Sequence, residues 1–382
     1  MPFQEIDTEN TYVEGEVWRK RVVAPLALPS FGWRVLHMGL AEDLVVREPD
    51  ANDCWSRNLN EPGKELIGNA HLSLGAKNAQ TIEILRDGVT LTELGLVLVE
   101  DREGSWGNMA EKAEGYCLDK VLERWSITAS AILESGPERS RFWTRWEGDH
   151  SWAELTFFIE RDSGEVLVEG RVLCNERSAR LQWIVSGGGG ATSDVPAGQV
   201  YREQPGQVPF SRWFWRERPG GVVGFASDVL GDVDFRKDES RVTLFRASRY
   251  ASGGAADAQE RPWRHTMECG LLDFRAAFFF ATDQALSICE RLRRPPIVHP
   301  VSPQPGDWKS SGTMAQVQPL SVELLSLKMD AGQVLTLRLR NAGEEAVRPN
   351  IVLDSGGYEF AELQAGEIRS EKVALPLQSL SD

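Results

Sequence analysis

Apolar and polar residues alternate along one stretch of this chain after another, and this period of two is typical of β-strands that face a core on one side. Seven segments show it: Gln80–Leu85, His150–Glu160, Glu165–Leu173, Arg180–Ser186, Arg241–Ser248, Val334–Arg340 and Glu371–Leu375. Turn-forming pieces such as "RDG" (Arg86–Gly88) and "DSG" (Asp162–Gly164) separate them. Strands that follow one another with little helix between them predict a mainly β chain built of antiparallel sandwich sheets.

One helix and two boundaries interrupt this pattern. Apolar residues recur at helical spacing over Thr282–Arg294, where Thr282 or Asp283 can cap the first turn. The Pro- and Gly-rich stretch Pro295–Gly312 that follows is typical of a connection between units. A chain of 382 residues exceeds the usual size of one domain. We therefore expect a short N-terminal β unit at 1–62, a large β-sandwich domain at 63–300 and a small β-sandwich unit at 301–382.

Composition excludes several classes of partner. The formal net charge of −15 argues against nucleic acid and anionic membranes, because binding to phosphates relies on clustered Lys and Arg. No apolar run is long enough to span a bilayer, and the polar start "MPFQEIDTEN" does not read as a secretory signal. The five cysteines and five histidines are scattered without metal-ligand spacing. We expect a cytoplasmic protein with free thiols and no metal cofactor.

Tryptophan is the most informative residue type, with 13 in the chain. In a strand, Trp213 and Trp215 would share one face, while Arg212 takes the other. Trp106 lies in the Gly-rich stretch "EDREGSWGN" directly after an apolar strand. An indole with nearby Arg or Asp suits a sugar, which has an apolar C–H face and a rim of hydroxyls. Packing in the core is the alternative role for each of these rings.

Seven segments in one order resemble the β-sandwich half of glycoside hydrolase family 38, the α-mannosidases. They are "EDREGSWGN" (Glu100–Asn108), "ESGPERSRFWTRWE" (Glu134–Glu147), "CNERSARLQ" (Cys174–Gln182), "VPAGQVYREQPGQVPFSRWF" (Val195–Phe214), "LFRASRYA" (Leu244–Ala251), "ECGLLDF" (Glu268–Phe274) and "LRRPPIV" (Leu292–Val298). The resemblance implies an antiparallel β-supersandwich of the galactose mutarotase-like type, with small flanking β units and one helix in the C-terminal half.

The same resemblance implies which residues meet a mannoside-type carbohydrate. The matched positions are Asp101 and Trp106, Arg212 and Trp213, and Asp228 in "SDVLGDVD" (Ser227–Asp234). Family members place an Asp nucleophile, an Asp acid and a zinc ion in a separate N-terminal barrel and helical bundle. Neither the zinc-ligand motifs nor the nucleophile has a counterpart in this chain, so the resemblance gives it no catalytic residue and no zinc.

Three functions follow as alternatives. The chain can be one half of a split α-mannosidase that completes the active site of a separate catalytic barrel. It can be a freestanding carbohydrate-binding or protein-interaction module, alone or as a homo-oligomer. By analogy of fold only, it can be an epimerase-like or lyase-like enzyme. The third would need a His, such as His150 or His265, facing a carboxylate across a concave sheet.

Overall fold

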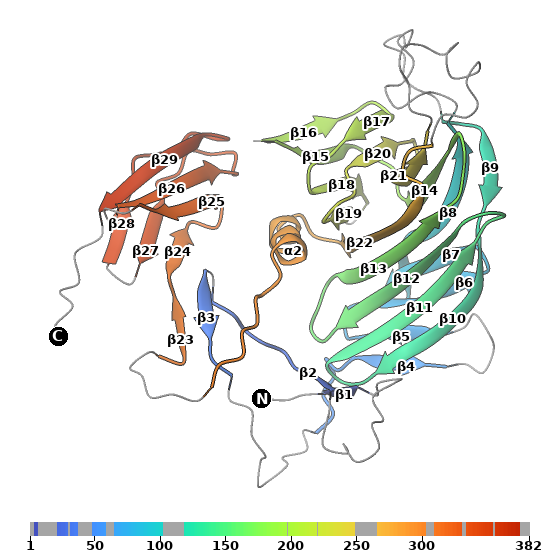
Figure 1. Ribbon diagram of the computed structural model, residues 1–382, viewed down its shortest axis with the longest axis horizontal. Coiled ribbons are helices and arrows are strands. Elements are labelled where there is room, and N and C mark those ends of the chain that lie inside the picture. Colours follow the sequence, from blue (N-terminus) through green and yellow to red (C-terminus); the bar gives the residue numbers. More distant parts are fainter. Residues whose placement is uncertain are drawn as a thin grey trace. The chain divides into compact units, whose positions relative to one another are not determined.

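The protein is described here by a computed structural model (Figure 1). The described residues are 4–6, 21–29, 31–36, 48–58, 65–101, 118–196, 198–219, 221–248, 266–302, 309–330, 334–353 and 356–374. The chain divides into two compact units. Unit 1 consists of Met1–Pro25, Arg47–Val195 and Gln199–Ile297, and unit 2 of Leu26–Val46, Pro196–Gly198 and Val298–Asp382. Unit 1 ends at Ile297 and the last segment of unit 2 begins at Val298, while the first 62 residues contribute to both units.

Two large sheets make up unit 1, and the strand pairs of described register are antiparallel. The nine-stranded sheet runs in the order β10 (Ser126–Ser135), β11 (Arg139–Glu147), β12 (Trp152–Glu160), β13 (Val166–Cys174), β22 (Gly270–Phe279), β19 (Gly221–Ser227), β18 (Trp213–Arg218), β15 (Ala191–Val195) and β16 (Gly198–Arg202). The ten-stranded sheet runs β17 (Gly206–Pro209), β20 (Asp232–Phe235), β21 (Glu239–Ala247), β14 (Ala179–Ser186), β8 (Val89–Glu100), β7 (Thr81–Arg86), β6 (Ser73–Asn78), β5 (Leu66–Gly68) and β4 (Trp55–Arg57), with β9 (Val121–Arg124) beside β8. A short pair, β1 (Gln4–Ile6) and β2 (Arg21–Val23), adds to them.

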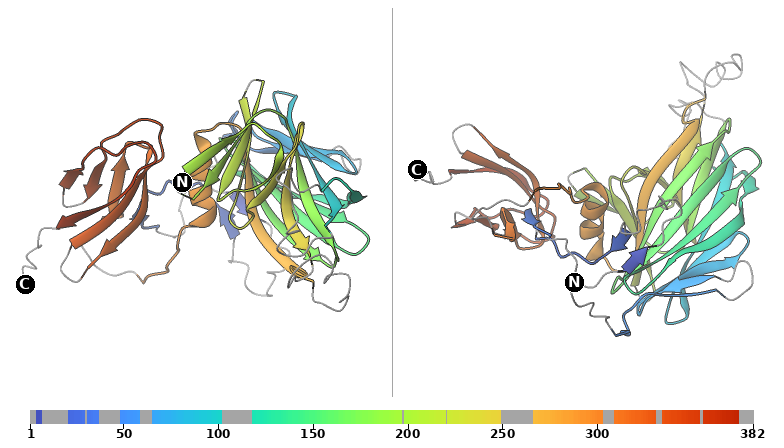
Figure 2. Two further views of the ribbon diagram at one scale, coloured as in Figure 1. Left: turned by 90° about the horizontal axis from the view of Figure 1, so that it is seen from above. Right: turned by 60° about the horizontal axis from the view of Figure 1, so that its bottom comes forward.

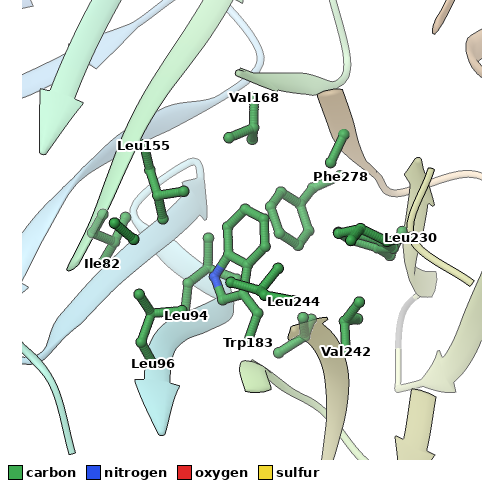
Figure 3. Packing of buried hydrophobic residues seen from close by; sticks show 14 of the residues in the cluster. Ile82, Leu94, Leu96, Leu155, Val168, Trp183, Leu230, Val242, Leu244 and Phe278 are labelled. Atoms are coloured by element: carbon green, nitrogen blue, oxygen red, sulfur yellow. The ribbon is translucent and has the colours of Figure 1, made fainter. Parts of the chain in front are cut away.

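The two sheets lie face to face and bury one continuous apolar core between them (Figure 1). Strands such as β11 and β13 bury every second residue on the core side, as the alternating sequence predicts. Trp183 of β14 lies near its centre and meets Phe278 of β22 with ring planes at 88° (Figure 3). The predicted fold class, mainly β with antiparallel sheets and one described helix, is confirmed.

Helix α2 (Gln284–Arg293) packs against β19 and β22 of the nine-stranded sheet (Figure 2). Its buried residues Ala285, Ile288, Cys289 and Leu292 pack with Trp213, Ala226, Ala277 and Phe279 of the sheet. Asp283 occupies the N-cap position, as expected, but makes no side-chain capping hydrogen bond. In the residues described, no helix is long and apolar enough to cross a membrane.

The close approach of β13 and β22 depends on one glycine. Gly170 lies directly opposite Phe274, and a Cβ atom at Gly170 would lie 2.2 Å from the Phe274 ring. The aromatic ring therefore occupies the space that a side chain at position 170 would need, on the core side of the sheet. This packing holds β13 beside β22, the two strands that carry the charged half of the site below.

Unit 2 is a small β-sandwich. Its strands are β3 (Gly32–Arg34) with β23 (Ser311–Thr313), β24 (Ala315–Gln318) with β27 (Asn350–Leu353) and β28 (Gly356–Glu359), and β25 (Val322–Met329) with β26 (Val334–Asn341) and β29 (Ile368–Ala374). The two three-stranded sheets share one core, in which Leu337 and Ile351 are fully buried.

Candidate functional site

The outward face of the nine-stranded sheet carries two rows of side chains that cross β11, β12, β13 and β22. Phe142, Thr144 and Trp146 are buried on the core side of β11, so Trp143 and Arg145 take the opposite face. Strand register then extends each position across the sheet. The first row is Trp143, Thr156, Glu169 and Arg275, and the second is Arg145, Glu154, Arg171 and Asp273.

A pocket of about 450 Å³ opens over these rows. Its lining consists of an indole, a hydroxyl, four carboxylates, two guanidinium groups and the backbone beneath them: Trp143, Thr156, Glu154, Glu169, Asp228, Asp273, Arg171, Arg275, Gly170 and Phe274. Glu169, Arg171 and Asp273 are exposed to solvent, whereas Trp143 is half-buried. The pocket is therefore polar over most of its floor and has one flat apolar wall.

Ion pairs fix the charged groups of the pocket. Arg171 Nε donates to Asp273 Oδ1 over 2.9 Å, and this hydrogen bond, with the charge of Asp273, raises the pKa of Arg171. The Arg275 side chain donates through Nε to Asp228 Oδ2 over 3.1 Å, and its backbone N–H donates to Asp228 Oδ1. Arg275 Nη2 also donates to the carbonyl of Leu292 in α2. The helix thus helps to orient one guanidinium of the site.

Glu169 differs from the other acids of the pocket. Glu154 pairs with Arg145 at 2.9 Å, while Asp228 and Asp273 pair with Arg275 and Arg171. Within the part of the chain that the structure describes, Glu169 has no ion pair and no side-chain hydrogen bond. Its carboxylate lies between Thr156 and Arg275 in the first row and is free to accept hydrogen bonds from a ligand.

Of the four predicted site residues that the structure describes, Asp228 lines this pocket and Asp101, Arg212 and Trp213 do not. Arg212 directly precedes β18, and its Nε donates to Asp194 Oδ2 over 2.6 Å. Trp213 is buried beneath α2 and stacks on Trp215 with ring centroids 4.3 Å apart. The two indoles do share a face, as expected, but α2 covers Trp213 and its role is packing.

The other two residues belong to a different part of the molecule. Asp101 follows β8 on the ten-stranded sheet, where its fully buried carboxylate accepts hydrogen bonds from Arg180 and Arg246. Asp101 therefore neutralises buried arginines and offers no surface for a ligand. Trp106 lies outside the described residues. The predicted site residues that can be placed therefore do not come together in one site.

Sequence reasoning missed Trp143, Glu169 and Arg171. The alternation in "RFWTRWE" does contain the signal, because burial of Phe142, Thr144 and Trp146 leaves Trp143 on the outward face. No histidine lines the pocket; His150 is exposed in the turn before β12, and His265 lies outside the described residues. Among the described residues, no three His, Cys, Asp or Glu gather as metal ligands.

Comparison with known proteins finds no matching protein family and no matching curated protein by sequence. Solved structures do match. The chain is similar to an α-mannosidase from Enterococcus faecalis V583, with a TM-score of 0.64 and 11% identity, over 82% of this chain and 42% of that one. A glycosyl hydrolase family 38 protein from Enterococcus faecalis matches with a TM-score of 0.65 and 11% identity, over 82% of this chain and 44% of that one.

These matches establish a likeness of fold. The resemblance to the β-sandwich part of family 38 α-mannosidases, expected from seven sequence segments, is confirmed at that level. The chain spans less than half the length of either α-mannosidase-type chain it matches.

Proposed function

We propose that this chain binds a carbohydrate, of mannoside type, in the pocket on the outward face of its nine-stranded sheet. The observation that carries the proposal is the first row, in which one half-buried indole, Trp143, shares a sheet face with the unpaired carboxylate of Glu169. An indole provides a flat apolar surface for the C–H face of a sugar ring. Carboxylates at fixed positions then accept hydrogen bonds from the hydroxyl rim, and guanidinium groups donate hydrogen bonds to it.

Charge and fold both support a neutral sugar as the ligand. The net charge of −15 does not favour an anionic ligand, and each arginine of the pocket is already paired with a carboxylate. The fold likeness is to an α-mannosidase and a family 38 glycosyl hydrolase, both from Enterococcus faecalis. Mannose and mannosides are therefore the first ligands to test.

Isothermal titration of the full chain with mannose, mannobiose, glucose and galactose tests this proposal. Mannosides should bind, and Trp143→Ala should weaken binding at least about tenfold, because an aromatic anchor carries much of the energy of such a contact. Trp152→Ala is the matched control. Trp152 is a half-buried tryptophan on the adjacent strand, stacked against Arg145, but it does not line the pocket.

The result for the two tryptophans decides the outcome. Binding that is equal in Trp143→Ala and the native chain would reject this pocket as the sugar site. The absence of any heat of binding with all four sugars would reject the carbohydrate function itself. Loss of binding in Trp152→Ala and not in Trp143→Ala would place the sugar against Trp152 and would also reject this pocket.

A second candidate function is association with a separate catalytic barrel. More than half of each matched α-mannosidase-type chain lies outside the part that this chain resembles. A family 38 barrel produced as a separate chain should then co-elute with this protein in gel filtration and hydrolyse an aryl α-mannoside only in the mixture. Separate elution at every ratio, with no hydrolysis, would contradict this function and leave the sugar-binding proposal to its own test.

A further inference from the structure

Two cysteines meet at the end of the strand pair β13 and β22. Cys174 is the last residue of β13 and lies opposite Gly270, the first residue of β22. Cys269 directly precedes Gly270. In a regular strand its side chain would point to the face opposite to that of Cys174, because neighbouring residues alternate.

The backbone at this point is not regular, and this brings the thiols together. Glu268 and Gly270 have positive φ values of 53° and 122°, so the chain rotates on both sides of Cys269. The Cys269 thiol consequently lies close enough to Cys174 to contribute to the raised pKa of the Cys174 thiol. The Cys269 Sγ also lies 3.6 Å from the carbonyl oxygen of Glu176.

The two thiols differ in environment. Cys174 is buried, with 3% of its surface exposed, whereas Cys269 is exposed. Burial is the main cause that raises the pKa of Cys174 to about 12. An accessible thiol beside a buried one is the arrangement in which the first can meet an oxidant and the second can resolve the product.

We propose that Cys174 and Cys269 are a redox modification site, at which a peroxide converts the two thiols into a reversible disulfide. The Cys269 thiolate attacks one peroxide oxygen, the O–O bond breaks, and a sulfenic acid forms with release of water or alcohol. The Cys174 sulfur then attacks the sulfenic sulfur, the S–S bond forms, and the hydroxyl leaves as water with the Cys174 proton. Two thiols are oxidised by two electrons in total, and one peroxide is reduced.

This disulfide would join the strands that carry half of the pocket. Arg171 lies on β13 three positions before Cys174, and Asp273 lies on β22 four positions after Cys269. Oxidation would therefore tie together the two strands whose Arg171–Asp273 pair borders the site. The proposal does not depend on carbohydrate binding, because it rests on the thiols alone.

The test uses the full chain, reduced, freed of reductant and treated with hydrogen peroxide before free thiols are blocked with iodoacetamide. Mass spectrometry of a digest should show one cross-linked peptide pair, Cys174 with Cys269, and a reducing phosphine should reverse it. Cys269→Ser and Cys174→Ser should each lower the cross-linked product to background. Cys54→Ser is the control and should not change it, because Cys54 is buried and donates to the carbonyl of Ile159 instead.

Two results would overturn the proposal. One is conversion of Cys269 to sulfinic or sulfonic acid while Cys174 stays alkylated. The other is a disulfide from either residue to a different cysteine. Since Cys269 is exposed, Cys269→Ser should fold normally, so its result stands even where Cys174→Ser folds poorly.

Discussion

Replacing Trp183 with alanine is expected to lower the free energy of unfolding of unit 1 by about 3–5 kcal/mol, as is usual when a large aromatic is removed from a packed core. Trp183 is fully buried and contacts four phenylalanine rings, those of Phe157, Phe225, Phe274 and Phe278. Figure 3 shows its ring among side chains from both sheets. Urea denaturation followed by far-UV circular dichroism measures the loss.

Trp183→Phe is the matched control and is expected to cost much less. The indole Nε1 of Trp183 is buried without a hydrogen-bond partner, so phenylalanine removes an unpaired donor while it keeps most of the ring contacts. A Trp183→Ala variant as stable as Trp183→Phe would show that the two sheets do not depend on this ring.

Asp101→Ala is expected to lower the free energy of unfolding by about 3–5 kcal/mol, for an electrostatic reason. Asp101 and Arg180 have side chains that are 0% and 1% exposed, and Asp101 Oδ2 lies 2.9 Å from Arg180 Nη2 and 2.6 Å from Arg246 Nε. Removal of the carboxylate takes a fully buried counter-charge away from the Arg180 guanidinium, whereas Asp232, which Arg180 also contacts, is partly exposed. Thermal and urea unfolding both measure the effect.

The control for Asp101→Ala is a variant that breaks an ion pair at the surface. Glu93→Gln breaks the exposed pair between Glu93 and Lys77. Such a pair contributes little, because water and salt screen it. Equal stability of the Asp101→Ala and Glu93→Gln variants would contradict the role given to Asp101.

The alternating pattern predicts strands such as β11 and β13 well because their buried residues occupy every second position. The segments expected as strands at His150–Glu160, Glu165–Leu173 and Arg180–Ser186 correspond to β12, β13 and β14 with small shifts at their ends. The helix expected at Thr282–Arg294 is present as Gln284–Arg293. Periodicity reports which face of an element is buried, and this is information that a local sequence contains.

The candidate site could not be predicted in the same way, because it depends on register between distant strands. Glu169 and Arg275 become neighbours only through the pairing of β13 with β22, which no local pattern specifies. Trp213 looked accessible in sequence because nothing there shows that α2 packs over it. Asp101 was expected to meet a carbohydrate, whereas it pairs with arginines from two other strands, Arg180 of β14 and Arg246 of β21.

The central claim, that a mannoside stacks on Trp143, is tested most directly by fluorine NMR of the full chain labelled with 5-fluorotryptophan. The resonance of Trp143 is assigned by its loss in Trp143→Phe. Addition of mannobiose should shift this resonance with saturation and leave that of the buried Trp183 in place. A Trp143 resonance that does not move at any sugar concentration would contradict the claim.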